Sequence, residues 1–236
     1  MYHKGMTRPY HAQSGNLFFY IFLAIALFAA LTFAVAQGNR GSVEDLANEQ
    51  DELYAAEIIQ YADTMSKAVA LMRLRGVRTE QIRFAHANLP GGYGVPNATP
   101  EAEIFNIDGG NMVYKAMPAP ISGTSMSFVF SGANAIDEVG TTCALATCSD
   151  LIMILRDIRS GVCAAINKLL DVTPNNQPIP NHSNVDDTTL YAGTFNVPAE
   201  TIGDEAGSAL LSGKSSGCFL GDADNVYYFY QVLVAR

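Results

Sequence analysis

The hydrophobic pattern begins with an uninterrupted apolar run near the N-terminus. Residues 17–36 carry no charged side chain, and Tyr20 and Thr32 are the only polar residues among them. About 20 apolar residues in a helix span the ~30 Å core of a bilayer, whereas the apolar core of a signal peptide has 7–15 residues. The run therefore predicts a transmembrane helix over residues 16–37. A long cleaved signal peptide and a buried core helix are the alternatives.

A second helical pattern covers residues 38–76. Gly38 and Gly41 weaken helix propensity, so an interruption is expected there, and Ser42 can cap a new helix. Apolar residues then recur at helical spacing, on the face opposite the acidic residues, and Gly76 can end the helix. They are Tyr54, Ile58, Tyr61, Ala62, Met65, Val69 and Met72. We expect this amphipathic extension to pack on a sheet of the same chain. The alternative, a coiled coil, needs a heptad repeat that does not persist here.

The remaining residues, 77–236, are predicted to form a β-rich globular domain. Short strands are expected at 104–107, 112–116, within 125–136 and at 190–197, and a helical stripe is expected to begin at Ser149. Residues 173–189 resemble a surface loop. The clearest hairpin joins 218–220 to 226–234 through a turn rich in Gly, Asp and Asn. The predicted fold class is α+β: a long membrane-spanning and amphipathic helix packed on a small antiparallel sheet, with an additional helix and disulfides.

Charge and composition exclude several classes of protein. Of the 236 residues, 49% are hydrophobic and 16% charged, which argues against intrinsic disorder. The 14 Lys and Arg are outnumbered by 23 Asp and Glu, so nucleic-acid binding is not expected. Residues 1–15 contain Lys4 and Arg8 but no acid, and acidic residues follow the apolar run. By the positive-inside rule, the N-terminus is predicted to be cytoplasmic and the C-terminal domain periplasmic or extracellular.

The four cysteines, Cys143, Cys148, Cys163 and Cys218, all lie in the predicted exported part. An even number of cysteines in an exported domain favours disulfides, with three possible connectivities. A zinc site is the alternative, but the wide separation of the last two cysteines and the scarcity of histidine disfavour it.

No catalytic constellation is evident, so the protein is not predicted to be an enzyme and no cofactor is expected. The Gly213–Gly217 segment matches the G-x-S-x-G pattern but has no histidine after it, so it is interpreted as a turn. Asp222, Asp224 and Asn225 resemble a fragment of a calcium loop, without a closing Glu. An ordinary hairpin turn explains them more simply, and calcium stays a weak alternative.

Taken together, a basic leader, Gly15, an apolar helix, an amphipathic extension and a β-rich domain resemble a type IV pilin or pseudopilin precursor. The resemblance implies cleavage after Gly15 by a prepilin-type peptidase, leaving Asn16 as the first residue. It implies that Tyr20 occupies the fifth mature position, where the family usually has Glu. It also implies a Cys163–Cys218 bridge near the C-terminus. We pair Cys143 with Cys148, whose separation of five residues closes a small loop easily, so that these two bridges are one of the three possible connectivities.

The predicted function is therefore that of a structural subunit, of minor type, in a cell-envelope filament or secretion apparatus. Its expected partners are the membrane, other pilin-like subunits bound through the N-terminal helix, and the peptidase. The predicted location is the inner membrane, as a single-pass protein. The alternative function is a membrane-anchored exported binding or envelope domain that forms no filament.

Overall fold

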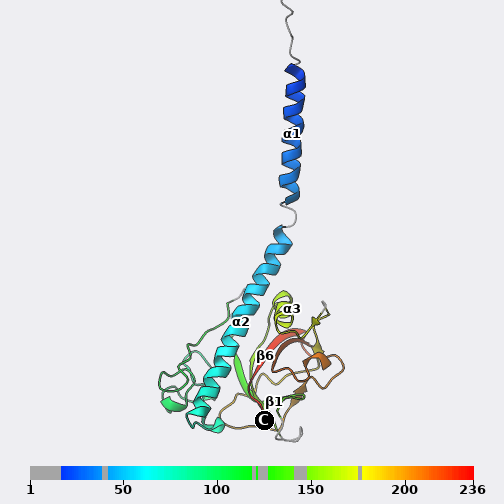
Figure 1. Ribbon diagram of the computed structural model, residues 1–236. Coiled ribbons are helices and arrows are strands. Elements are labelled where there is room, and N and C mark those ends of the chain that lie inside the picture. The colour runs from blue at the N-terminus through cyan, green and yellow to red at the C-terminus, as the bar shows by residue number, and fades with distance from the viewer. Residues whose placement is uncertain (1–16, 39–41, 119–120, 122–126, 141–147, 175–176) are drawn as a thin grey trace, which may run out of the picture. The chain divides into compact units, whose positions relative to one another are not determined.

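The computed structural model describes residues 17–38, 42–118, 121, 127–140, 148–174 and 177–236. The chain divides into two compact units, Met1–Ala47 and Asn48–Arg236. Helix α1 (Leu17–Gly38) belongs to the first unit, and α2 (Ser42–Leu74) begins there and continues through the second (Figure 1). The boundary between α1 and α2 lies where the glycines of residues 38–41 predict an interruption.

The second unit is built on a mixed six-stranded sheet in the order β3-β5-β6-β2-β1-β4. Its strands are β1 (Val129–Ile136), β2 (Asp150–Leu155), β3 (Asn181–His182), β4 (Glu200–Ile202), β5 (Ser216–Gly221) and β6 (Val226–Val234). The four central strands pair antiparallel, whereas each edge strand pairs parallel with its neighbour. A third helix, α3 (Ser160–Leu169), follows β2, and short 3-10 turns occupy Thr79–Gln81, Gly91–Tyr93, Pro100–Ala102 and Ala209–Leu211.

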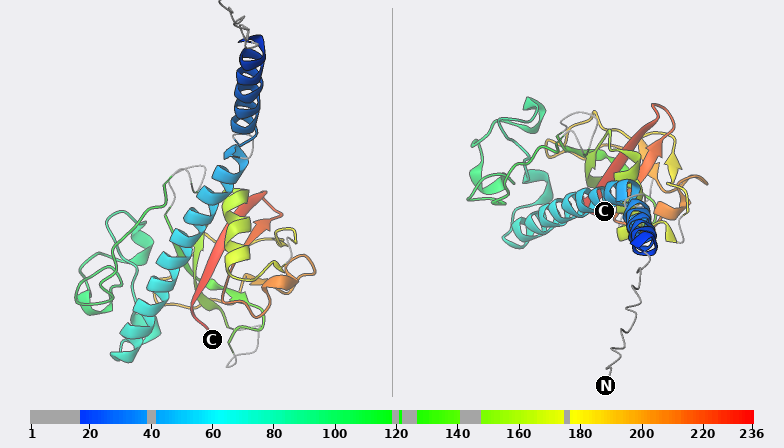
Figure 2. Two further views of the ribbon diagram at one scale, coloured as in Figure 1. Left: turned by 45° about the horizontal axis from the view of Figure 1, so that its top comes forward. Right: turned by 90° about the horizontal axis from the view of Figure 1, so that it is seen from above.

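Both faces of the sheet are buried. One face packs against α2 and α3, whose apolar residues share a core with alternate residues of the strands; Figure 2 shows both helices on this side. In β2, Leu151, Met153 and Leu155 belong to that core. Ile152 and Ile154 point the other way, into a second core closed by the edge strands and loops. As a result every residue of β2 is buried.

The sheet curls so far that its two edges nearly meet. The backbone N–H of Asn181, in edge strand β3, donates to the carbonyl of Gly207, which follows the opposite edge strand β4. The N–H of Ser183 donates to Glu205 Oε2 at 3.0 Å. Ile202 of β4 and Phe219 of β5 lie in the same enclosed core. The result is a nearly closed, barrel-like sheet.

The predicted fold class is therefore wrong. The sheet is mixed and nearly closed rather than small and antiparallel, because its short parallel edge strands give no periodic signal. Residues 151–155 form a strand, not a helix: a strand buried on both faces has a continuous apolar sequence that also fits a helical stripe. The strands expected at 104–107, 112–116 and 190–197 are irregular segments instead.

The membrane-spanning part of that prediction is not supported either. Within the part of the chain that the structure describes, no helix has both the length and the apolar character needed to cross a membrane. A single-pass inner-membrane location consequently has no support from the structure.

Candidate functional site

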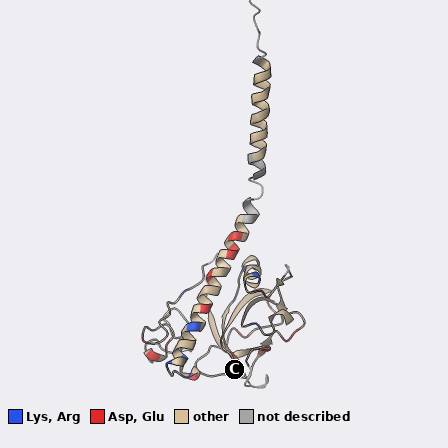
Figure 3. Cartoon of the chain, viewed as in Figure 1, with Lys and Arg blue, Asp and Glu red and all other residues tan. Residues whose placement is uncertain are grey.

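The most unusual surface of the first unit is the apolar surface of α1, defined here as its described side chains, residues 18–34. Eleven large side chains lie on it, with exposed fractions from 46% at Ile21 to 74% at Phe28. They are Phe18, Phe19, Tyr20, Ile21, Phe22, Leu23, Ile25, Leu27, Phe28, Leu31 and Phe33. Figure 3 shows charged residues along α2, whereas the described part of α1 has none. An exposed apolar surface of this extent marks an interaction site.

This surface surrounds the helix. Residues 18–22 are all exposed and apolar or aromatic, and five successive residues of an α-helix point around its whole circumference. The hydroxyl of Thr32 donates to the carbonyl of Phe28 at 2.6 Å, so it needs no partner outside the helix. The phenol of Tyr20 is the remaining polar group among residues 18–34. The α1 apolar surface can therefore be buried by apolar neighbours on all sides.

Of the residues predicted to act in processing and assembly, Tyr20 lies on α1, where it is 66% exposed and forms an edge-to-face contact with Phe19. Gly15 and Asn16 lie outside the described residues. Cleavage between them remains an expectation from the sequence.

The predicted Cys163–Cys218 disulfide is confirmed. It joins α3 to β5, with the two Cα atoms 5.5 Å apart, and both cysteines are fully buried. Cys148 is also disulfide-bonded. Its predicted partner, Cys143, lies outside the described residues.

The carboxylates of the weak calcium candidate in the β5–β6 hairpin accept hydrogen bonds from other groups of the protein. Asp222 Oδ2 accepts from the Asn181 side chain, and Asp224 Oδ2 accepts from the Tyr228 hydroxyl at 2.5 Å. Asn225 has a φ of 58°, which suits an Asx residue in a tight turn. These contacts are those of a hairpin turn.

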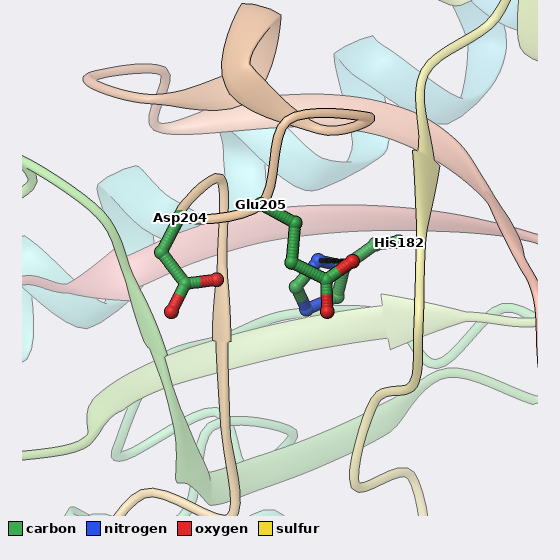
Figure 4. A group of neighbouring side chains, drawn as sticks. All are labelled: His182, Asp204 and Glu205. Atoms are coloured by element: carbon green, nitrogen blue, oxygen red, sulfur yellow. Dashed lines mark ion pairs between the residues drawn. The ribbon is translucent and has the colours of Figure 1, made fainter.

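A polar cluster that the sequence analysis did not anticipate lies where the two sheet edges meet. It consists of His182 from β3 and of Asp204 and Glu205 from the turn after β4 (Figure 4). One imidazole nitrogen and one oxygen from each carboxylate lie within 4.8 Å of one another. Gly203, whose φ of 104° favours glycine, makes the turn that presents the two acids.

The environments of these three side chains differ. His182 is 1% exposed, whereas Glu205 is partly exposed and Asp204 is exposed. His182 Nδ1 lies 3.3 Å from Glu205 Oε2 and 3.1 Å from Ser208 Oγ. Hydrogen bonds from Ser183 lower the pKa of the Glu205 carboxyl group, which keeps it ionised beside the imidazole. The cluster therefore combines a buried nitrogen ligand with two carboxylates that solvent reaches.

No signal in the sequence reveals this cluster. His182 falls in a segment predicted to be a surface loop, and Asp204 and Glu205 look like solvated surface acids. The cluster forms only because the sheet nearly closes, which brings its two opposite edges together.

Comparison of the chain with known protein families, with curated proteins and with solved structures finds no match.

Proposed function

We propose that this protein is a structural subunit of a pilin-like or pseudopilin-like assembly and that its copies associate through α1. The observation that carries the proposal is the α1 apolar surface, which surrounds the helix and contains no charged side chain. A groove on a single partner would cover one side of such a helix. A bundle of α1 helices, one from each copy of the chain, would cover every side.

The globular unit has its own hydrophobic cores, so α1 is available for association with other copies. Both hydrophobic cores consist of residues from Ala55 onward, and no described residue of α1 belongs to either. The Cys163–Cys218 disulfide and the buried faces of the sheet stabilise this unit without α1. The helix can therefore serve association while the unit from Asn48 to Arg236 keeps its fold.

The sequence resemblance supports the same proposal. A basic leader ending at Gly15 and followed at once by an apolar helix is the arrangement of a pilin-like precursor. Tyr20 supports a minor rather than a bulk subunit. A phenol, with an ordinary pKa of ~10, is not an anion at neutral pH and cannot neutralise the terminal amine of a neighbouring copy.

The experiment compares two apolar-to-lysine variants of the full-length protein, purified in mild detergent. Ile25→Lys places a charge within the α1 apolar surface, whereas Ile107→Lys makes the same change at a 78% exposed loop residue of the globular unit. Burying an unpaired charge between helices costs several kcal/mol, so association should weaken by at least a hundredfold. Sedimentation velocity at several protein-to-detergent ratios gives the oligomeric state.

Wild type and Ile107→Lys should form oligomers of the same size, and Ile25→Lys should sediment as a monomer. A wild-type protein that stays monomeric at every ratio would refute the proposal. An Ile25→Lys variant that still forms oligomers of the wild-type size would refute it as well.

A further inference from the structure

The cluster of His182, Asp204 and Glu205 occupies a distinctive place in the fold. His182 belongs to one edge strand of the sheet, and the two acids follow the opposite edge strand. Direct contacts already join the two edges. They include Asn181 N–H to the Gly207 carbonyl and Ser183 N–H to Glu205 Oε2. Any ligand shared by the three side chains would therefore join the two edges.

The donor atoms have the spacing that one metal ion requires. Bonds of about 2.0–2.1 Å to a tetrahedral Zn²⁺ place two ligand atoms about 3.3 Å apart. The distance from His182 Nδ1 to Glu205 Oε2 is 3.3 Å. An Asp204 oxygen lies within 4.8 Å of one imidazole nitrogen and of one Glu205 oxygen, and because the Asp204 side chain is exposed it can rotate closer. In Figure 4 both carboxylates are turned toward the imidazole.

A second observation concerns the imidazole itself. His182 is 1% exposed, and its Nε2 has no hydrogen-bond partner among the described residues. The polar contacts of this buried ring are therefore made through Nδ1, with Ser208 and Glu205. With the proton on Nε2, the Nδ1 lone pair points toward the carboxylates. The hydroxyl of Ser208 can then donate to the Glu205 carbonyl, 3.3 Å away.

We propose that His182, Asp204 and Glu205 bind a divalent transition-metal ion of the Zn²⁺ class, with water completing the coordination. One nitrogen and two carboxylate ligands suit Zn²⁺, whereas Ca²⁺ takes six to eight oxygen ligands and Mg²⁺ also prefers oxygen. Among divalent first-row metals, a site containing imidazole binds Zn²⁺ more tightly than Mn²⁺ or Fe²⁺. The bound ion holds the two sheet edges together and stabilises the nearly closed sheet.

The test measures Zn²⁺ binding to the full-length protein by competition with a chromogenic chelator. Asp204→Asn removes an exposed ligand, and Asp108→Asn makes the same change at an exposed loop residue outside the cluster. Wild type and Asp108→Asn should bind Zn²⁺ with equal affinity and show the same rise in Tm. Asp204→Asn should weaken the binding at least tenfold and reduce the rise in Tm.

His182→Gln provides the second variant, with near-UV circular dichroism as the check that it folds. It should lose the site completely. The other histidines, His3, His11 and His86, are unchanged in all variants, so their background binding cancels in the comparison. If wild type binds no Zn²⁺, or if Asp204→Asn and a folded His182→Gln both bind it as tightly as wild type, the proposal is wrong.

Discussion

Asn167 on α3 makes two hydrogen bonds to the backbone of Cys218 in β5. Its Nδ2 donates to the Cys218 carbonyl at 2.8 Å, and its Oδ1 accepts from the Cys218 N–H at 2.9 Å. Asn167 is fully buried and lies one helical turn beyond Cys163, the disulfide partner of Cys218. Because β3 pairs with β5 only at Leu220 and Gly221, the Asn167 amide takes the place of a strand partner at Cys218.

We expect Asn167→Ala to lower the free energy of unfolding by about 3 kcal/mol, because a buried donor and a buried acceptor each lose their partner. Urea unfolding of the full-length protein in detergent, followed by near-UV circular dichroism of the tyrosines, measures the change. Asn88→Ala, at an exposed loop position, is the matched control and should change stability by less than ~0.5 kcal/mol. Equal effects of the two substitutions would contradict this role of Asn167.

Replacing both Cys163 and Cys218 by alanine should lower the free energy of unfolding by roughly 4 kcal/mol. The bridge closes a loop across a sequence separation of 55 residues, and a cross-link of that length restricts the unfolded chain by about this amount in the chain-entropy model. The same urea unfolding measurement compares the double variant with wild type under non-reducing conditions. A loss below ~1 kcal/mol would show that the bridge contributes little.

Asp150 should make stability depend on pH in a specific direction. Its carboxylate is buried and accepts hydrogen bonds from the N–H groups of Ile136 and Arg236. Burial raises the pKa of Asp150 above its ordinary value despite these bonds. Between the unfolded and folded pKa values the folded state binds more protons, so the contribution of Asp150 falls as pH rises through that interval.

The free energy of unfolding of wild type minus that of Asp150→Asn should therefore be highest near pH ~3 and fall as pH rises through the pKa of Asp150 in the folded protein. Above that pKa it should be constant. Urea unfolding of both proteins from about pH 3 to about pH 7 provides the comparison. A difference that grows with pH would mean that hydrogen bonding, and not burial, dominates the titration of Asp150.

Gly161 and Asp51 should be energetically coupled. A Cβ at Gly161, near the start of α3, would lie 1.9 Å from Asp51 Oδ2, and this carboxylate also pairs with Arg159. Alanine favours a helix by about 1 kcal/mol over glycine, but in wild type the clash should cancel that gain. In the Asp51→Ala background, Gly161→Ala should stabilise by about 1 kcal/mol. A double-mutant cycle measures the coupling. If the effects of Gly161→Ala and Asp51→Ala on the free energy of unfolding simply add, the two residues are not coupled.

Some elements could be predicted because their sequence signals are local. The β5–β6 hairpin has a Gly-, Asp- and Asn-rich turn between a short apolar segment and one rich in β-branched and aromatic residues, and it forms as expected. The apolar residues spaced three and four apart from Ile58 to Met72 correspond to the buried face of α2. The Cys163–Cys218 bridge followed from the family resemblance.

Other elements depend on the tertiary structure. The strand β2 has no alternation because both of its faces are buried, so its sequence fits a helix equally well. The edge strands β3 and β4 have two and three residues, too few for any periodicity. The cluster around His182 depends on these edge strands, so it could not be predicted until the closure of the sheet was known.

The central claim, that α1 of one copy contacts α1 of another, is tested most directly by site-specific photo-cross-linking. The photoreactive residue p-benzoylphenylalanine replaces Phe22, which is 69% exposed on α1, and in a separate control it replaces Val113, which is 80% exposed in the globular unit. After irradiation in mild detergent, mass spectrometry identifies the linked peptides. We expect intermolecular α1–α1 peptides from position 22 and none from position 113. Cross-links from position 22 to detergent alone, with no α1–α1 peptide, would contradict it.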